Sequence, residues 1–486
     1  MRPRVRFLDD SLIERIISEA RDILCQLGVT IHNDRVLSLL ADNGATVDIS
    51  ERLVRFTPAL IDRALGTTPD SITLYDVLGL KAVDISGDKV HFTPGSSAVY
   101  MLDSGAHESR WATSADYIKF AKIIGQLEYL HSQSTAMVPS DVHEKIADSY
   151  RLFLSLLYCE KPVVTGTFTI ESFKLMKNLQ VTVRGSEKEL AAKPLTIFSA
   201  CPTSPLKWSD VTSQNLLDCA RYKIPVELVA MPMAGFIAPV TLVGTLVQHT
   251  AETLSGLVIS QTANPGTPVL YGGSPGIFDI RYETTPMGAP ETEMIDCAYG
   301  EIGKYLKIPT QAYIALSDAK HLDAQAGLET SMGAVLAGLA GINHISGPGM
   351  LDFENCFSLE KLVVDNEICG MVYRILAGIE PKEDFPAIPR FEELLKEQHL
   401  LISKHTRKYL KEEHFQPGPV IERANRARWL KEGSLTLGEK ARKEVEKLVN
   451  RYEPSRLDRD IKKELVRLME EEARRYGFTK LPPIEL

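Results

Sequence analysis

The chain has 486 residues, a formal net charge of −9 and a hydrophobic content of 44%, which are ordinary values for a large globular protein. The negative charge argues against a nucleic-acid partner, because binding to phosphates requires a basic face. The amino terminus lacks the apolar segment of a secretory signal, and no apolar run reaches the roughly 18 residues that cross a membrane. The 7 cysteines are scattered and never form a Cys-x-x-Cys pair, as in proteins with reduced thiols, so we expect a cytoplasmic protein.

Residues 1–90 are predicted to form a helical cap and a small antiparallel sheet. Apolar residues recur at helical spacing over residues 12–27, and Gly28 is expected to end this helix. A second helix is predicted near residues 34–43. Short alternating segments separated by turn residues then predict strands at 46–49, 53–56, 71–75, 81–85 and 89–93.

From residue 91 to residue 380, predicted strands alternate with helices. Nearly continuous apolar strands with helical crossovers are typical of a parallel sheet, and eight such units are the number in a (β/α)8 barrel. A doubly wound open sheet is the alternative, but the G-x-G-x-x-G phosphate loop that usually follows its first strand is not convincing anywhere in the chain. The predicted strands are 98–102, 129–138, 162–168, 195–200, 225–231, 268–271, 310–316 and 342–345.

Residues 381–486 are predicted to be a helical extension. Three prolines, at positions 381, 386 and 389, mark a linker, and charge-rich helices are expected at 399–410, 433–452 and 459–476. The predicted fold class is therefore α/β: a (β/α)8 TIM barrel with an N-terminal α+β extension and a C-terminal helical extension.

Polar and small residues collect at the predicted carboxyl ends of the strands, where such a barrel keeps its active site. Glycine and proline at these positions let a ligand approach the backbone and its N–H groups. The candidate groups are Ser96 and Ser97 with Tyr100, Ser134, Thr165, Ser199 with Cys201, the segment 271–276, Ser317 with Asp318 and Lys320, and the segment 344–349.

Several of these candidates have a structural alternative. His344 lies within a predicted strand and could be a core histidine. Lys320 could form a Schiff base with a carbonyl substrate, as in a lyase or an aldolase, or it could form a structural ion pair with Asp318. A zinc site made by Cys201, Cys356 and His344 is a further hypothesis, but paired-cysteine and H-x-x-x-H motifs are missing, so we predict no metal.

The ordered motifs resemble the trimethylamine methyltransferase (MttB) superfamily over nearly the whole chain. They are GGSPGIFD at 272–279, GAPE at 288–291, SDxK at 317–320 with DxQAG at 323–327, GPGML at 347–351 and VDNEI at 364–368. Because the chain is written wholly in standard residues, it resembles the branch without pyrrolysine. Characterised members of that branch are similar to a (β/α)8 barrel and move a methyl group from a quaternary amine, such as glycine betaine, to Co(I) of a separate corrinoid protein.

The resemblance implies a quaternary-amine methyltransferase that depends on a cognate corrinoid protein, with a cobalamin-type cofactor carried by that partner. It also implies aromatic walls for the trimethylammonium group and polar donors for a carboxylate. A betaine-binding protein without turnover is a second alternative, and small residues in the barrel helices would allow a homo-oligomer. The candidate catalytic residues at the barrel mouth are Asp318, Lys320 and Gln325. The candidate substrate-binding residues are Tyr100, Tyr271, Phe278 and Phe357 as walls, and Gly273, Ser274, Arg281 and His344 as donors.

Overall fold

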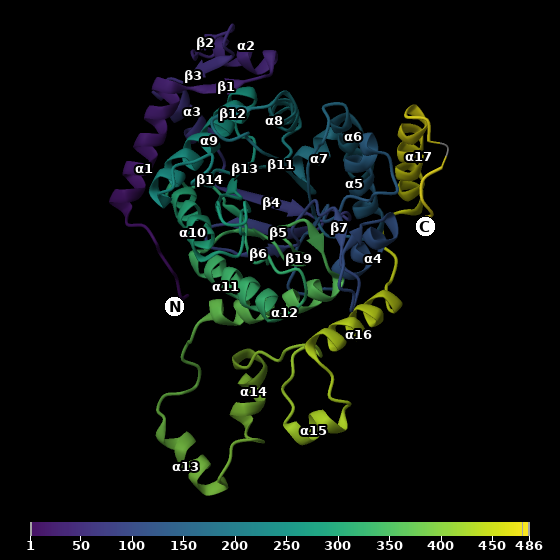
Figure 1. The fold of residues 1–486 in the computed structure, drawn as a ribbon. Coiled ribbons are helices and arrows are strands. Elements are labelled where there is room, and N and C mark those ends of the chain that lie inside the picture. Colours follow the sequence, from purple (N-terminus) through teal and green to yellow (C-terminus); the bar gives the residue numbers. More distant parts are fainter. Residues whose placement is uncertain (1, 479, 485–486) are drawn as a thin grey trace.

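The structure, a computed structural model, describes residues 2–478 and 480–484. Its centre consists of two parallel sheets, one with the strand order β15-β13-β11-β10-β9 and one with the order β17-β18-β6 (Figure 1). Single bridges join their edges, between Phe92 and Leu130 and between Tyr271 and Thr310. The strand bounds are β6 (His91–Thr93), β9 (Gln133–Ser134), β10 (Val163–Thr165), β11 (Thr196–Ala200), β13 (Val226–Ala230), β15 (Val269–Gly273), β17 (Gln311–Tyr313) and β18 (His344–Ser346).

Helices follow the parallel strands and surround them, as Figure 1 shows. This alternation confirms the predicted α/β class, and the closed (β/α)8 barrel stays our interpretation of two sheets joined by bridges. The helices are α4 (Ser114–Ile124), α5 (Ala147–Tyr158), α6 (Ser172–Arg184), α7 (Glu187–Ala192), α8 (Asp210–Tyr222), α9 (Leu242–Ala263), α10 (Pro290–Tyr305), α11 (Ala324–Ala340) and α12 (Leu359–Ala377).

The first parallel strand differs from the prediction. The sequence predicts it at 98–102, but β6 takes that place and pairs with β18. Residues of the predicted strand instead form β7 (Tyr100–Met101), which lies in a small sheet with β8 (Arg110–Trp111), β19 (Met350–Leu351) and β20 (Cys356–Phe357). The local pattern could not reveal this, because the partner of β6 is distant in the sequence.

The N-terminal segment forms helices and a small sheet in which β1, β2 and β3 are antiparallel. Gly28 follows a single π turn and has φ 88°, so it ends the first helix in a conformation that glycine tolerates best. The sheet also includes β12 (Lys207–Trp208), which pairs with β1 in parallel. The elements are α1 (Asp10–Asp22), α2 (Asp34–Asp42), α3 (Pro58–Thr67), β1 (Val29–Ile31), β2 (Thr46–Asp48) and β3 (Leu53–Arg55).

A hairpin of β4 (Ser71–Tyr75) and β5 (Lys81–Ser86) packs against the inner face of the parallel strands. Its apolar side chains share one buried cluster with Ile197 of β11 and Leu270 of β15. Side chains two residues further along a strand lie on the same face, so Ser199 and Gly272 face the same space nearer the carboxyl ends. The hairpin therefore fills the amino-terminal part of this space and leaves polar side chains at the other end.

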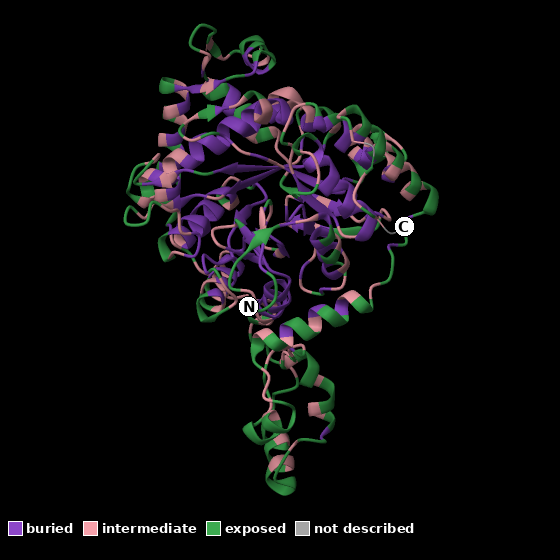
Figure 2. Cartoon of the chain, turned by 45° about the vertical axis from the view of Figure 1, so that its right-hand side comes forward, coloured by how far each residue is buried: buried purple, intermediate pink, exposed green. Residues whose placement is uncertain are grey.

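Some of the C-terminal helices pack on the body of the protein and others project away from it. The long helices α16 (Leu437–Asn450) and α17 (Arg459–Arg475) pack on the body, against α4 and α12 and against α5 and α6 respectively. The helices α13 (Ile388–Glu397), α14 (Lys404–Glu413) and α15 (Arg426–Lys431) project away from it and are largely exposed (Figure 2). Within the described ranges, no helix has the length and apolar character needed to cross a membrane. The division at residues 90 and 380 stays a prediction.

Candidate functional site

Polar side chains from three parallel strands and one loop converge on Glu227. The Ser199 hydroxyl donates to Glu227 Oε1 at 2.7 Å, and the Tyr313 hydroxyl lies 3.3 Å from the same oxygen. Ser96, in the loop after β6, contacts the Tyr313 hydroxyl at 3.0 Å. Glu227 is fully buried, whereas Ser96 and Ser199 are partly exposed.

Glu354 reaches the same place from the turn between β19 and β20. Its carboxyl accepts a backbone hydrogen bond from Ser96, and a Cβ atom added at Gly95 would lie 2.9 Å from Glu354 Oε1. Three consecutive residues of this turn, Asp352, Phe353 and Glu354, have φ values of 51°, 56° and 65°. A left-handed conformation costs about 1–2 kcal/mol for each residue with a side chain, and such strain is concentrated at functional sites. The turn thus holds Glu354 over the strand ends at a cost in stability.

Arg151 of α5 is a buried cation beside these groups. Its Nη1 donates to the Ser97 hydroxyl at 3.1 Å and to the Thr135 carbonyl at 3.0 Å. The guanidinium carbon lies 4.4 Å from the centre of the Phe168 ring. Its Nε atom is buried without a hydrogen-bond partner, and no carboxylate among residues 2–478 and 480–484 forms an ion pair with it. Burial lowers the pKa of Arg151 and the charge of Asp148, three residues earlier on α5, opposes this shift, but no ion-pair contact joins the two, whereas buried charges are ordinarily paired directly.

We call Ser96, Arg151, Ser199, Glu227, Tyr313 and Glu354 the interior cluster. Burial raises the pKa of Glu227 to about 7, although the bonds from Ser199 and Tyr313 oppose this effect. Burial also raises the pKa of Glu354 to about 8, and the nearby Glu227 adds to the shift. One oxygen of each carboxyl, Glu227 Oε2 and Glu354 Oε1, is buried without a partner. Both acids are therefore partly protonated near neutral pH and would ionise if a cation entered.

The side chains of the predicted catalytic residues Asp318 and Gln325 hold neighbouring loops in place, and their catalytic role stays a prediction. The Asp318 carboxylate accepts the backbone N–H groups of Met287 and Gly288, each at 2.9 Å. Gln325 donates to Glu329 Oε1 at 2.8 Å, and Glu329 Oε2 accepts the Asp318 N–H at 2.9 Å. Burial raises the pKa of Asp318 to about 6. The SDxK and DxQAG motifs thus join the loop after β17 to the start of α11 and to the GAPE segment.

Lys320 binds the strained turn that carries Glu354. Its Nζ lies 2.7 Å from Asp352 Oδ1 and 3.9 Å from the centre of the Phe353 ring, and it donates to the Asp318 carbonyl at 2.8 Å. The structural ion pair considered for Lys320 thus exists, but its acid is Asp352 rather than Asp318. Through these contacts, Lys320 stabilises the turn that carries Glu354.

The four predicted aromatic walls lie outside the interior cluster. The Tyr271 hydroxyl donates to Thr250 of α9 at 2.9 Å, so the ring is packed outside the strands. Phe357 is fully buried with its ring 5.3 Å from that of Phe120. The other two predicted walls each pack against a neighbouring ring. Tyr100 packs on Trp111 and Phe278 packs on Phe236, with ring centres 4.7 Å apart in both pairs.

The predicted carboxylate donors are also dispersed. Arg281 is exposed and forms an ion pair with Asp279 at 2.6 Å. His344 is fully buried with Nε2 3.0 Å from the Ser132 hydroxyl, and burial lowers its pKa to about 3, as for a core histidine. A Cβ atom at Gly273 would lie 2.4 Å from His249 Nε2, so this glycine allows close packing of β15 on α9. Ser274 has its hydroxyl 4.0 Å from Met287 Sδ. The role of each in binding substrate stays a prediction.

Sequence reasoning missed Glu227, Arg151 and Glu354. The first two do carry a signal, because each is a charged residue inside an otherwise apolar segment: VELVA for Glu227 and YRLFLSLLY for Arg151. Such residues are almost never fully buried unless paired, which makes them candidates for function. Glu354 has no comparable signal, since its position depends on the backbone of the turn.

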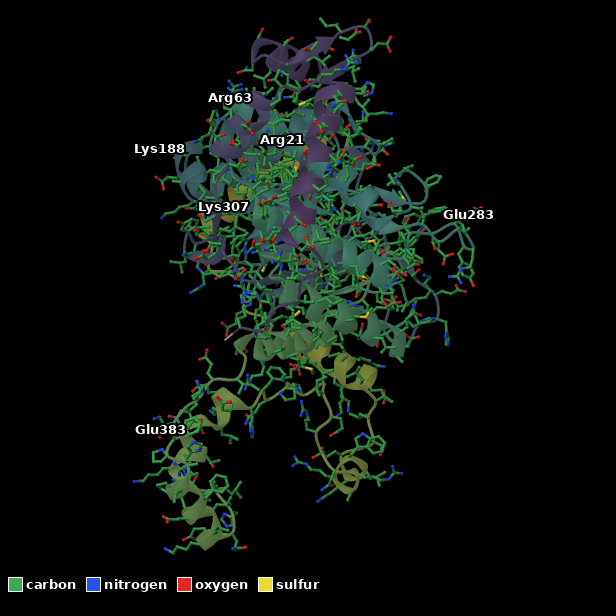
Figure 3. The ribbon with its side chains drawn as sticks, turned by 90° about the vertical axis from the view of Figure 1, so that its left-hand side faces the viewer. Arg21, Arg63, Lys188, Glu283, Lys307 and Glu383 are labelled. Carbon is green, nitrogen blue, oxygen red and sulfur yellow. The ribbon has the colours of Figure 1, made fainter. Side chains whose placement is uncertain are left out.

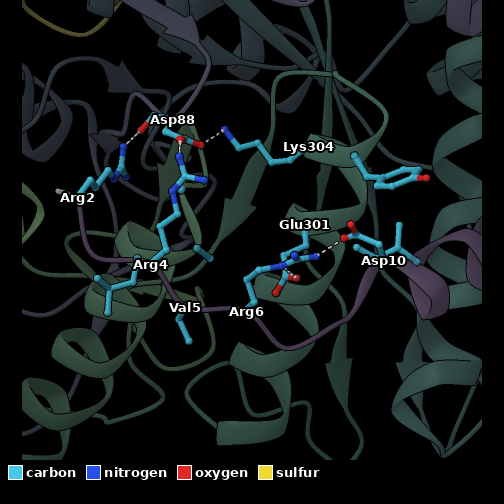
Figure 4. Close-up of a pocket in the computed structure, with 13 residues that line it drawn as sticks. Arg2, Arg4, Val5, Arg6, Asp10, Asp88, Glu301 and Lys304 are labelled. Carbon is cyan, nitrogen blue, oxygen red and sulfur yellow. Dashed lines mark hydrogen bonds and ion pairs between the residues drawn. The ribbon is translucent and has the colours of Figure 1, made fainter.

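A separate cavity of about 260 Å³ lies at the amino-terminal side of the strands (Figure 4). The N-terminal segment lines it together with Asp88, Glu301 and Lys304. Ion pairs within the lining, including Arg6 with Asp10 at 2.6 Å and Arg4 with Asp88, join most of its charged side chains, and Arg2 donates to the backbone carbonyls of Asp88 and Gly338. We therefore interpret it as a packing junction between the N-terminal segment and the body. In the part of the chain that the structure describes, no group of His, Cys, Asp and Glu side chains is arranged to hold a metal ion.

Comparison with known proteins decides the family. A model of the trimethylamine methyltransferase (MTTB) family matches residues 1–477. The chain belongs to the trimethylamine methyltransferase family. Among its relatives, a trimethylamine methyltransferase MttB of Methanosarcina barkeri (strain Fusaro) is 30% identical over 450 residues, covering 91% of this chain and 90% of the relative. A glycine betaine methyltransferase of Desulfitobacterium hafniense (strain Y51) is 27% identical over 479 residues, covering 98% of each chain. This member of the family is thus a methyltransferase.

Solved structures support the fold of this trimethylamine methyltransferase family member. The monomethylamine methyltransferase MtmB of Methanosarcina barkeri matches with a TM-score of 0.54 at 12% identity, covering 98% of this chain and 89% of that chain. Its hydroxylamine complex matches with the same TM-score at 13% identity. At this level of identity the likeness concerns the fold alone.

Proposed function

We propose that the protein transfers a methyl group from a betaine, a quaternary amine that carries a carboxylate, to Co(I) of a corrinoid held by a partner protein. The proposal treats the two bridged sheets as one (β/α)8 barrel with the interior cluster at its carboxyl-terminal mouth. The observation that carries it is the charge pattern of the cluster: two carboxyls with free oxygens, and one guanidinium that forms no direct ion pair. A zwitterion with an ammonium and a carboxylate supplies both missing partners.

Glu227 and Glu354 would hold the quaternary ammonium. A permanent cation near the two acids favours their ionised forms, so their raised pKa values would fall when the donor binds. The Tyr313 ring is an aromatic surface of the same cluster, although its hydroxyl is committed to Ser96 and Glu227. Two carboxylates and one ring would thus position an N-methyl group without any proton donor.

Arg151 would hold the carboxylate of the donor. A guanidinium binds a carboxylate through parallel N–H donors, and its Nε atom is free to take part. This role replaces the one predicted for Arg281, whose guanidinium is exposed and bound to Asp279. The unpaired arginine favours a betaine over trimethylamine, because trimethylamine has no carboxylate to balance the buried charge.

The chemistry places few demands on the protein once the donor is positioned. The C–N bond of the methyl group breaks with its electron pair moving to nitrogen, so the leaving group is a neutral tertiary amine that needs no proton. The corrinoid of the partner would supply the cobalt(I) nucleophile that accepts the methyl group. The residues of this chain bind and orient the donor and exclude water from it, which are the contributions expected where positioning dominates.

A spectrophotometric assay tests the proposal. Reduced cobalamin is mixed with the protein and with glycine betaine, another betaine, tetramethylammonium or trimethylamine, and the loss of the Co(I) absorbance is followed. We expect methylation by at least one betaine at a rate well above that with trimethylamine. Methylation by trimethylamine alone, or neither methylation nor thermal stabilisation by any betaine, would contradict the proposal. Thermal stabilisation without transfer would favour a betaine-binding protein or a strict need for the corrinoid protein, and adding that partner separates the two.

A further inference from the structure

A projecting arm, residues 379–434, joins α12 to α16. Figures 1 and 2 show it extending from the body, and Figure 3 shows the same from the side, with Glu383 on the arm. None of the residues of its three helices α13, α14 and α15 is buried. The arm therefore has almost no hydrophobic core of its own, although it contains several large apolar side chains.

Large apolar side chains are exposed along the first half of the arm, and we call them the apolar face. On α13, Ile388, Phe391 and Leu395 follow the i, i+3, i+7 spacing and so lie on one side of the helix. Single exposed apolar residues are normal, but a group of this size on a projecting element marks an interface. The exposed large residues, each between 58% and 92% exposed, are Ile379, Phe385, Ile388, Phe391, Leu395, Leu401 and Ile402.

The polar groups of the arm are already paired within the chain. At its base, Arg374 of α12 donates to the Glu413 carbonyl at 2.8 Å, and Glu367 accepts the Gly418 N–H at 2.8 Å. Further out, Lys382 pairs with Glu412 and Lys408 pairs with Glu383. These bonds stabilise the conformation of the arm, but they do not cover the apolar face.

We propose that the arm is the interface with a second copy of this chain, in which the apolar faces of two arms pack on each other about a two-fold axis. With roughly 150–200 Å² for each large apolar side chain, the face exposes on the order of 900 Å² per copy. A standard stable interface buries about 800 Å² on each partner, so the area is sufficient. A two-fold axis brings the same patch of both copies together, which suits a face that is apolar throughout.

Charge also favours a second copy. The whole chain has a formal net charge of −9, but the arm contains nearly equal numbers of acidic and basic residues. Two arms can therefore approach each other without the repulsion that two acidic surfaces would meet. A copy of the same chain is also present whenever the protein is made, so it can cover an apolar face permanently.

Sedimentation equilibrium of the full-length protein tests the proposal. We expect the mass of a dimer at micromolar concentration. The double variant Phe391→Asp with Leu395→Asp should have the mass of the monomer, because it places charges at the centre of the face. The control is Ile49→Asp, which changes an exposed apolar residue in the turn between β2 and β3 and should leave the dimer intact.

Circular dichroism and thermal melting show whether the double variant still folds. Both residues are exposed, so a native spectrum and a native melting profile of the isolated chain are expected. A monomeric wild-type protein over the whole concentration range would overturn the proposal and leave the face to a different protein. A double variant that stays dimeric would overturn it as well, since another surface would then hold the dimer.

Discussion

Glu227 and Tyr313 meet across the strand that separates them. Glu227 lies on β13 and Tyr313 on β17, with β15 between them, and the Tyr313 hydroxyl is 3.3 Å from Glu227 Oε1. Their side chains therefore point into the same space, although the strands belong to different sheets. Because Ser199 and Tyr313 both use Oε1, Glu227 Oε2 is left for a ligand.

Replacing Glu227 by glutamine should remove most of the activity. Glutamine keeps the size and the bonds to Ser199 and Tyr313, but it cannot become negative beside a cation. Loss of a buried charged partner costs about 2–5 kcal/mol, so we expect kcat/KM for a betaine to fall roughly 100-fold. The matched control is Glu51→Gln, an exposed acid in the turn between β2 and β3. Unchanged kinetics in Glu227→Gln would place the ammonium elsewhere.

Replacing Arg151 by lysine should weaken the use of methyl donors that carry a carboxylate and should spare donors that lack one. Lysine keeps a positive charge but loses the planar pair of donors, so KM for glycine betaine should rise roughly tenfold. Tetramethylammonium, which lacks a carboxylate, should be used equally well by both proteins. Arg281→Lys is the control and should change neither donor. An equal loss with both donors would show that Arg151 supports the fold and does not select the substrate.

Thermal stability should fall as the pH rises from 5 to 8 in the absence of donor. In the folded protein the pKa of Glu227 is raised to about 7 by burial, against an ordinary value of 4.5. The folded state thus binds more protons than the unfolded state, and its stability decreases with pH through this window, by on the order of 3 kcal/mol for this group. Melting curves of the wild type and of Glu227→Gln measure the effect, and the variant should show a shallower dependence. Identical dependences would mean that Glu227 does not titrate in this range.

Lys320 should act by holding the turn that carries Glu354. Lys320→Gln removes the ion pair with Asp352, so kcat/KM should fall about fivefold, and Lys320→Arg should restore part of it because it keeps the charge. Borohydride reduction with carbonyl compounds should trap no adduct at this residue. A covalent adduct at Lys320 would revive the Schiff-base alternative.

The sequence predicted the class of the fold well, because the apolar strands and the helical crossovers are local patterns. It predicted a strand at 89–93 but assigned it to the N-terminal antiparallel sheet, since only the pairing with His344, Ile345 and Ser346 shows that β6 is the first parallel strand. Of the interior cluster, the sequence indicated Ser96 and Ser199 as candidates. The other candidates were selected by residue type and by their position at strand ends. Neighbouring side chains on a strand point to opposite faces, so a shift of one residue changes the face. The Tyr271 side chain points to the outer face, toward α9.

The motifs that carry the family resemblance place Asp318 and Gln325 in loops near the strand ends. Their side chains bind loop backbone and Glu329, so their predicted catalytic role stays a prediction. Glu354 could not be found from the sequence, because three left-handed residues aim it and nothing in their side-chain types requires that conformation. Charged residues inside apolar segments, such as Glu227 and Arg151, were the signal available.

Isothermal titration with glycine betaine in two buffers of different ionisation enthalpy tests the central claim most directly. If Glu227 and Glu354 hold the quaternary ammonium, binding at pH 7 lowers their pKa values and releases protons, so the observed enthalpy differs between the buffers. We expect one site per chain, net proton release, and affinity that rises as the pH increases from 6 to 8. Binding without proton release and with no dependence on pH would show that the cation does not meet these two acids.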